Sequence, residues 1–195
     1  MQKPRRLIAH ISRTHLSFIA ACLIAWLGVA PEPSLSAAEQ DWKVGMSRVK
    51  ITPPYPVWMS GYASRDKPFQ SVEADLYAKA LALTDHVGNR AILITSDLIG
   101  FPADVAEPIC ERISKKTGLK RSQILLSSSH THTGPGTTTK TKSEGDLPPE
   151  DAKRLYDFTG WLQDRVVELA VEAFEKKPQP ARLSRGTGVV NFVMN

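Results

Sequence analysis

A buried strand, an amphipathic helix and a second buried strand follow one another between residues 91 and 127. Residues 91–96 (AILITS) and 124–127 (ILLS) are short apolar runs, which are typical of strands buried inside a sheet. The segment between them, residues 103–116, repeats apolar side chains on one helical face, at Val105, Ile109 and Ile113. This succession predicts a βαβ crossover, in which the two strands lie parallel in one sheet.

Two residues define the expected bounds of that helix. Gly118 follows the last apolar position, where a glycine commonly ends a helix in a left-handed conformation. The helix is expected between about Ala103 and Lys116, and Pro108, which has no N–H to donate inside a helix, is awkward in this range unless the regular helix starts near it.

The segments before the crossover predict further strands. Residues 44–52 and 76–84 are β-prone, and a turn at residues 85–90 joins the second of them to residues 91–96 as a hairpin. Proline and other turn formers between residues 53 and 73 predict a long loop.

The segments after the crossover complete the expected fold. Residues 137–149 are polar and predict a loop over the ends of the parallel strands. Residues 150–176 predict a long amphipathic helix with an apolar stripe packed on the sheet. Residues 181–194 are β-prone and reach the end of the chain without a stop signal. We therefore expect an α/β fold with a mixed sheet, a βαβ crossover and a long packed helix, forming an incomplete domain.

The first 38 residues have the pattern of a secretory signal peptide. A basic start precedes an apolar run at residues 16–30, and Ser36 and Ala38 supply the small residues of a cleavage site. The prediction is export to the periplasm or the extracellular space, and an uncleaved anchor is the alternative. Lipidation at Cys22 is disfavoured because apolar residues continue beyond it. After cleavage Cys110 is the one remaining cysteine, so no intramolecular disulfide can form.

The positive charge of the chain lies largely in this leader. The whole sequence has 25 basic and 20 acidic residues, and residues 1–38 hold four of the basic residues and one of the acidic ones. Residues 39–195 therefore keep 21 basic against 19 acidic residues. This near balance argues against nucleic acid as a partner.

The strongest chemical motif follows the second parallel strand, as His130-Thr131-His132. In an extended backbone residues i and i+2 point to one side, so both imidazoles would face one ion or substrate. Neutral imidazole is a common zinc ligand, but a catalytic zinc takes three protein ligands. Asp97, at the end of the preceding strand, is the candidate for a third ligand or for a carboxylate that orients a histidine. A polar strand end without metal remains the alternative.

Other residues near this motif are weaker candidates for a functional role. A serine run leaving a strand (residues 127–129) usually bonds to the backbone, and no Gly-x-Ser-x-Gly motif marks a nucleophile there. Gly134 and Gly136 either allow backbone amides to approach a substrate or form a turn. Tyr62 either lines the site or packs, and His86 is expected to be solvated in the hairpin turn.

Several motifs in a fixed order resemble one family. The segments are VGMSRVKITPP, MSGYASR, ADLYAKALAL, AILITSDLIG and ILLSSSHTHTGPG, which together span residues 44–136. Their succession resembles the amino-terminal part of the neutral/alkaline ceramidase family, and VVNFVMN at the end is a weaker match. Residues 39–195 would then be the amino-terminal portion of a ceramidase-like catalytic domain.

The resemblance implies an exported zinc-dependent amidohydrolase that cleaves the N-acyl bond of ceramide into a sphingoid base and a fatty acid. It implies that His130 is a zinc ligand and that His132 lies beside the metal and contacts the reacting amide. A lipid substrate further implies transient contact with a membrane surface.

The sequence also departs from the family pattern. The family completes its metal site with a second histidine, a glutamate and a tyrosine further along the chain, and no histidine follows residue 136 here. The chain is therefore expected to be a fragment. Two alternatives are another metal hydrolase that uses an H-x-H pair, of the amidohydrolase or metallo-β-lactamase kind, and an exported binding module without catalysis.

Overall fold

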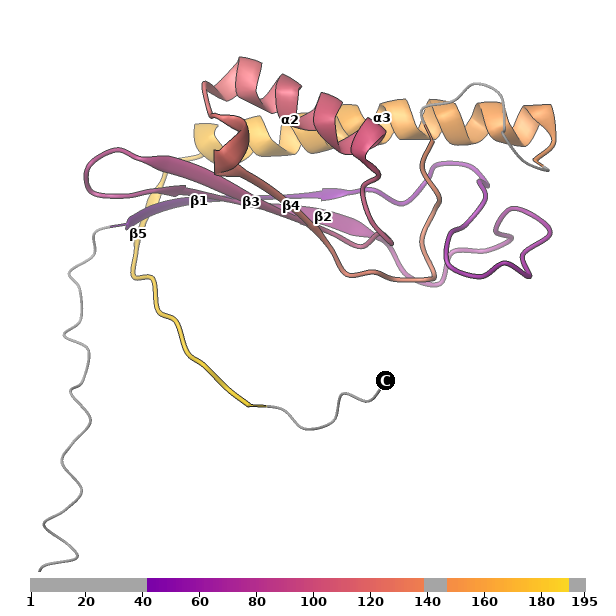
Figure 1. Ribbon diagram of the computed structural model, residues 1–195, viewed down its shortest axis with the longest axis horizontal. Coiled ribbons are helices and arrows are strands. Elements are labelled where there is room, and N and C mark those ends of the chain that lie inside the picture. Colours follow the sequence, from indigo (N-terminus) through magenta and orange to yellow (C-terminus); the bar gives the residue numbers. More distant parts are fainter. Residues whose placement is uncertain (1–41, 139–146, 190–195) are drawn as a thin grey trace, which may run out of the picture. The chain divides into compact units, whose positions relative to one another are not determined.

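A mixed five-stranded sheet in the order β4-β3-β2-β1-β5 forms the centre of the fold (Figure 1). The computed structural model describes residues 42–138 and 147–189. Strand β1 (Trp42–Lys50) pairs antiparallel with β2 (Tyr77–Thr84) and with the short β5 (Gln179–Ala181). Strand β3 (Arg90–Ser96) pairs antiparallel with β2 and parallel with β4 (Ile124–Ser128). The predicted hairpin and mixed sheet are confirmed.

The connection between β3 and β4 is the predicted βαβ crossover. Helix α2 (Ala103–Thr117) and the single 3₁₀ turn η1 (Arg121–Gln123) join the two parallel strands, which pair from Ile92 with Ile124 onward. Gly118 ends α2 with φ of 74°, and its N–H donates to the carbonyl of Ser114 at 2.8 Å, as expected of a left-handed cap.

The start of α2 at Ala103 is as predicted, but Pro108 lies inside the regular helix rather than near its beginning. The proline ring offers no N–H to the carbonyl four residues earlier. Three apolar side chains of the helix are fully buried in the core, those of Val105, Ile109 and Ile113. Their burial stabilises the helix although Pro108 cannot make its backbone hydrogen bond.

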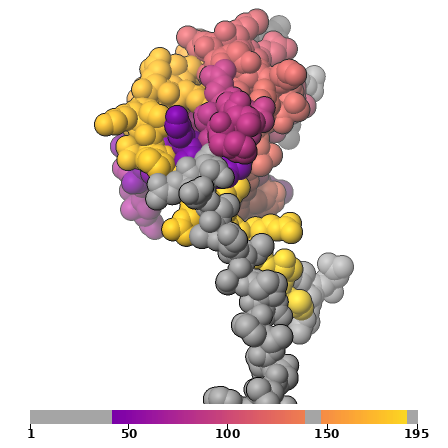
Figure 2. Space-filling model, turned by 90° about the vertical axis from the view of Figure 1, so that its left-hand side faces the viewer, coloured from indigo at the N-terminus to yellow at the C-terminus, as the bar shows by residue number. Residues whose placement is uncertain are grey.

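Helices α2 and α3 (Pro149–Glu175) lie side by side on one face of the sheet (Figure 1). Figure 2 shows their carboxyl-terminal parts next to each other, seen from the end of the sheet where β1 begins. The strand residues under the helices are small on β2 and branched on β3, and α3 turns its apolar stripe toward them. The shared buried set is Ala78, Ala80, Ala82, Ile92, Ile94, Phe158, Leu162, Val166 and Leu169.

The opposite face of the sheet is not covered by any described helix or strand. One row of apolar side chains crosses four strands on this face, since register pairs Met46 with Leu81, Leu81 with Leu93, and Leu93 with Leu125. Met46 and Leu125 are 62% and 59% exposed. The prediction that β4 is wholly buried is therefore wrong, because β4 is an edge strand and its second face is open.

The end of the chain differs from the expected strand at residues 181–194. Strand β5 covers only Gln179–Ala181, and residues 182–189 have no regular secondary structure. β5 runs antiparallel to β1 and pairs Ala181 with Trp42, so residues beyond Ala181 have no described part of β1 left to pair with. Residues 190–195 lie outside the described residues.

Three other expectations fall wholly or largely outside the described residues. These concern the leader (residues 1–38), its apolar run, and the centre of the polar loop at residues 139–146. Within residues 42–138 and 147–189, no helix has the length and apolar character needed to cross a membrane. The predicted loop at residues 53–73 is confirmed, with one isolated bridge at Met59.

Candidate functional site

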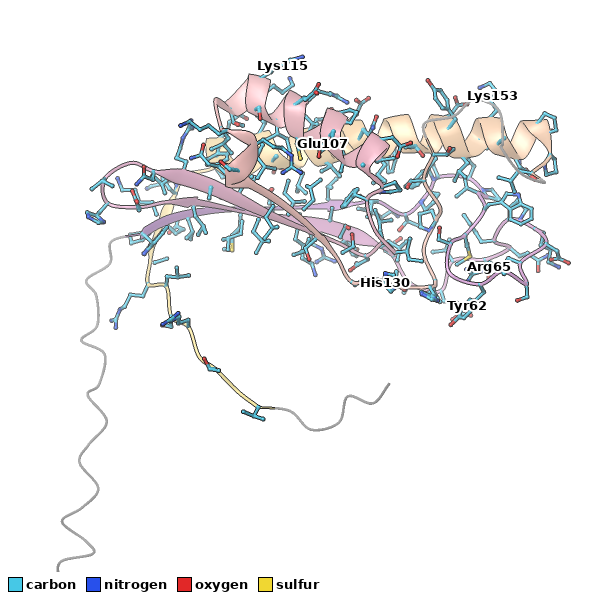
Figure 3. All side chains as sticks on the ribbon, in the orientation of Figure 1. Tyr62, Arg65, Glu107, Lys115, His130 and Lys153 are labelled. Atoms are coloured by element: carbon cyan, nitrogen blue, oxygen red, sulfur yellow. The ribbon has the colours of Figure 1, made fainter. Side chains whose placement is uncertain are left out.

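The two histidines lie in the loop that follows β4, at the carboxyl ends of the parallel strands. The backbone of Ser129 still donates to the carbonyl of Ser96 at 3.0 Å, and the chain then leaves the sheet. Figure 3 shows His130, Tyr62 and Arg65 gathered at this edge, away from the helices. The carboxyl end of parallel strands is the usual position of ligand sites in such folds.

The backbone at His130 is left-handed, with φ of 58°. The prediction that His130 and His132 leave an extended strand on one side is therefore wrong in its geometry, because strand pairing ends before His130. The left-handed turn nevertheless brings the two rings together. Their centroids are 5.3 Å apart and their planes meet at 65°, so a single ligand can contact both imidazoles.

The ring of His130 is oriented by one backbone carbonyl. Nδ1 of His130 lies 2.8 Å from the carbonyl oxygen of Ile99, in the loop after β3. A carbonyl only accepts, so Nδ1 donates this hydrogen bond, and in the neutral ring that does so Nε2 carries the lone pair. A backbone carbonyl behind one ring nitrogen is the arrangement that commonly orients a metal-binding histidine. His130 is also exposed, which leaves Nε2 open to a ligand.

His132 is held by a second loop, residues 60–65, which sequence reasoning left without a defined role. Tyr62 meets the His132 ring edge-on at a centroid distance of 5.1 Å. The Arg65 guanidinium donates to the carbonyl of His132 at 2.6 Å and also bonds to the carbonyl of Ser60. Arg65 further lies 5.0 Å from the centre of the Tyr62 ring. Tyr62 therefore contacts the site, and Arg65 is the positioning residue that the motif MSGYASR contained unrecognised.

The two loops are joined by a short antiparallel pairing. The Ser60 N–H donates to the carbonyl of Gly134 at 3.1 Å, and the Gly136 N–H donates to the carbonyl of Trp58 at 2.8 Å. Because the Gly136 amide is bonded within the protein, it is not free to approach a substrate oxygen. At this position the interpretation as a structural turn is the correct one.

Asp97 has a structural contact rather than a place among metal ligands. Its carboxylate accepts the N–H of Tyr77 at 2.9 Å and so extends the pairing of β2 with β3. Across residues 42–138 and 147–189, no group of three histidine, cysteine, aspartate or glutamate side chains could hold a metal. The expectation that Asp97 joins the histidines as a third ligand is therefore not met in these ranges.

The remaining candidates have local roles. The Ser128 hydroxyl is 2.9 Å from that of Ser96, so it links the ends of β4 and β3. His86 is exposed in the turn between β2 and β3, as expected.

Comparison with known proteins shows which family model and which solved structures this chain matches. A family model described as neutral/alkaline non-lysosomal ceramidase, N-terminal, matches residues 42–143. A solved neutral ceramidase from Pseudomonas aeruginosa is similar in structure, with a TM-score of 0.55 and 20% identity. A ceramidase solved in complex with C2 is similar at a TM-score of 0.54 and 20% identity. Each match covers 72% of this chain and 22% of the solved chain. No curated protein matches the sequence.

Proposed function

Because the chain belongs to the neutral/alkaline non-lysosomal ceramidase family, we propose that it contributes to zinc-dependent hydrolysis of the N-acyl bond of ceramide-like lipids. In this proposal His130 is a zinc ligand and His132 contacts the reacting amide. The products are a sphingoid base and a fatty acid. The observation that carries the proposal is the pair of imidazoles. The carbonyl of Ile99 orients the His130 ring, and the centroid of that ring lies 5.3 Å from the centroid of the His132 ring.

His130 fits one ligand position of a zinc site. The contact of Nδ1 with the carbonyl of Ile99 favours the neutral tautomer in which Nε2 carries the lone pair that a zinc ligand requires. When bound, zinc supplies Lewis acidity, which polarises an amide carbonyl and lowers the pKa of water. A catalytic zinc takes three protein ligands, and no group of three such side chains is present among residues 42–138 and 147–189, so His130 is one ligand of an incomplete set.

The second histidine has the attributes of a residue that contacts substrate. Arg65 fixes its backbone, and Tyr62 supports one edge of its ring, so the imidazole has a defined orientation. His132 is therefore suited to donate a hydrogen bond to the carbonyl oxygen of the amide, or to move a proton to the leaving amine.

The chain spans about a fifth of the length of the solved ceramidases it matches, since it covers 22% of each. We therefore propose that these residues form part of a larger active site, and that hydrolysis needs ligands in addition to His130. Zinc binding with His130 as the ligand from the described residues is expected to be weaker than in a site with three protein ligands.

Zinc binding provides the first test. His130→Ala is expected to abolish the zinc-dependent shift of the imidazole signals in an NMR titration. His86→Ala is the matched control, because His86 is an exposed histidine in the β2–β3 turn and should leave the titration unchanged. A folded protein that binds no zinc, or one whose binding survives His130→Ala, would contradict the proposal and favour a binding module without metal.

Hydrolysis provides the second test. In a full-length protein that supplies the remaining ligands, release of fatty acid from a short-chain ceramide should depend on added zinc and should fall by about 10²-fold or more in His132→Ala, the usual scale for losing an acid–base group. The His86→Ala variant should keep its activity. Hydrolysis of a simple amide but not of the ceramide would instead favour another class of metal hydrolase.

We further propose that the protein is exported and that its lipid substrate brings it into transient contact with a membrane surface. The proposal of export rests on the signal pattern of residues 1–38. Amino-terminal sequencing of the exported protein should begin at Glu39. A protein retained with Met1 or Gln2 at its start would contradict cleavage and favour an anchor.

A further inference from the structure

Residues 58–60 lie between helix α3 and the histidine loop, residues 129–136. On the side of the histidine loop, two backbone hydrogen bonds of 3.1 and 2.8 Å hold this segment in place. On the side of the helix, Nε1 of Trp58 donates to Oδ2 of Asp151 at 3.0 Å. Asp151 lies in the first turn of α3, so one side-chain contact ties the segment beside the histidine loop to the helix.

The contact between Trp58 and Asp151 has the character of an anchor. Both side chains are half-buried, and their hydrogen bond joins segments 93 residues apart. A carboxylate in the first turn of a helix is favoured by the helix dipole, and hydrogen bonds to a charged acceptor are stronger than those to a neutral one. The preceding residue, Val57, is only 1% exposed, so the backbone at Trp58 is also fixed by the core.

Helix α3 supports the histidine loop at a second point. The N–H of Thr138, two residues beyond the loop, donates to the hydroxyl of Thr159 at 2.9 Å, and Thr159 is buried in α3. A Cβ on Gly136 would lie 3.7 Å from the side chain of Leu155, which is also in α3. The helix is therefore the common support of the histidine loop and of residues 58–60.

Residues 58–60 lead directly into the contacts that hold His132. A Cβ on Gly61, the next residue, would lie 2.5 Å from the His132 side chain. The Arg65 guanidinium bonds both to a carbonyl of this segment and to the carbonyl of His132. The ring of His130 is instead oriented by a carbonyl in the loop after β3. A displacement of residues 58–60 would therefore move His132 and leave the orientation of His130 in place.

We propose that Trp58 and Asp151 are positioning residues, whose hydrogen bond sets the orientation of the His132 imidazole through the backbone of residues 58–60. This inference rests on the proposed function, since His132 is the residue assigned there to the reacting amide. The effect is one of geometry, because the hydrogen bond acts through the backbone. A small misplacement of a catalytic group is enough to slow a reaction substantially.

Histidine NMR of the full chain tests the positioning without metal or catalysis. At one fixed alkaline pH, the His132 ring signals and the Overhauser contact between the Tyr62 and His132 rings report their geometry, since the ring centroids are 5.1 Å apart. Asp151→Ala should shift the His132 signals and weaken that contact. Asp151→Asn should leave both as in the unchanged protein, because the amide oxygen still accepts the indole N–H.

Asp164→Ala is the matched control. Asp164 is another carboxylate of α3, and it contacts Arg112 of α2 at 2.6 Å, so its loss removes a helix contact that does not involve the loops. This variant should leave the His132 signals unchanged. A shift in Asp164→Ala equal to that in Asp151→Ala would overturn the positioning, because any disturbance of α3 would then move the ring.

A second variant guards against misfolding of Asp151→Ala. Trp58→Phe removes the same hydrogen bond from the donor side and keeps an aromatic ring, so it should shift the same His132 signals. The double variant should show no further shift, because one hydrogen bond can be lost only once. Unmoved His132 signals in both single variants, or shifts that add in the double variant, would overturn the inference.

The outcomes separate this inference from the proposed function. The zinc-dependent shift of the His130 signals should be the same in Asp151→Ala as in the unchanged protein. In a full-length protein that supplies the remaining ligands, Asp151→Ala should lower kcat about tenfold with KM unchanged. A moved His132 ring with unchanged kcat would overturn the proposed role of His132 and leave the positioning supported. An unmoved ring would overturn the positioning alone.

Discussion

Single residues in two loops determine how the histidines meet. His130 adopts a left-handed backbone at φ of 58°, which costs a residue with a side chain about 1–2 kcal/mol. The contact of its Nδ1 with the carbonyl of Ile99 offsets part of this cost. Strained residues that persist in this way cluster at functional sites, which agrees with the proposed role of His130 as a ligand.

Gly61 is the residue that allows the second loop to reach His132. It has φ of 109°, and a Cβ built there would lie 2.5 Å from two His132 side-chain atoms. Gly61→Ala should therefore lower the free energy of unfolding by about 2–3 kcal/mol, from backbone strain together with steric overlap. The NMR signals of the His132 ring should shift at the same time. Chemical denaturation and the histidine spectrum measure both effects.

Gly88 supplies the control for that prediction. It also has a positive φ, of 91°, but a Cβ added at Gly88 would meet no atom within 4 Å. Gly88→Ala should therefore show the backbone cost alone, about 1 kcal/mol, without any change at His132. An equal decrease of the free energy of unfolding in Gly61→Ala and Gly88→Ala would contradict a steric role for Gly61 at the site.

At the scale of elements, the sheet and α3 approach each other closely at β1. A Cβ on Gly45 would lie 1.8 Å from the carbonyl oxygen of Ala173 in α3. Nearby, the buried Ser47 hydroxyl donates to the carbonyl of Leu169 at 2.7 Å. The small residues of β2 extend this flat surface, so the helix packs directly on the strand backbones.

Gly45→Ala should force β1 and α3 apart. The expected loss in the free energy of unfolding is about 3 kcal/mol, because the opposing atom is backbone and cannot rotate away. Gly160→Ala is the control within α3, where the added methyl meets no atom within 4 Å. That change should instead stabilise the helix by about 0.5–1 kcal/mol. Thermal and denaturant unfolding of both variants would decide whether close packing at Gly45 matters.

The elements themselves could be predicted well from the sequence, and contacts between loops could not. Periodicity identified α3 and the βαβ crossover, since residues three or four apart on a helix share one face. The contact of Arg65 with His132 joins segments 67 residues apart, and no local pattern encodes such a pairing. The extended geometry expected at His130 failed for a related reason, because a strand persists only where a neighbouring strand pairs with it.

At the scale of the whole molecule, the two faces of the sheet are unequal. The helices cover one face, and the other presents the apolar row of Met46, Leu81, Leu93 and Leu125. A second row, Arg48, Lys79 and Thr95, lies next to it and is mainly cationic. Burying a leucine or methionine side chain contributes about 1.5–3 kcal/mol, so this face is a surface that favours association.

The apolar row predicts measurable behaviour of the isolated chain. It should bind an apolar fluorescent dye such as anilinonaphthalene sulfonate and should self-associate as concentration rises. Met46→Glu combined with Leu125→Glu should lower both effects roughly twofold or more, because Met46 and Leu125 are the most exposed members of the row.

Val87→Glu adds an acidic side chain at an exposed turn outside the row and should change neither effect. Dye fluorescence and sedimentation velocity measure the two quantities. Equal responses of the double variant and the control would show that association comes from net charge rather than from this face of the sheet.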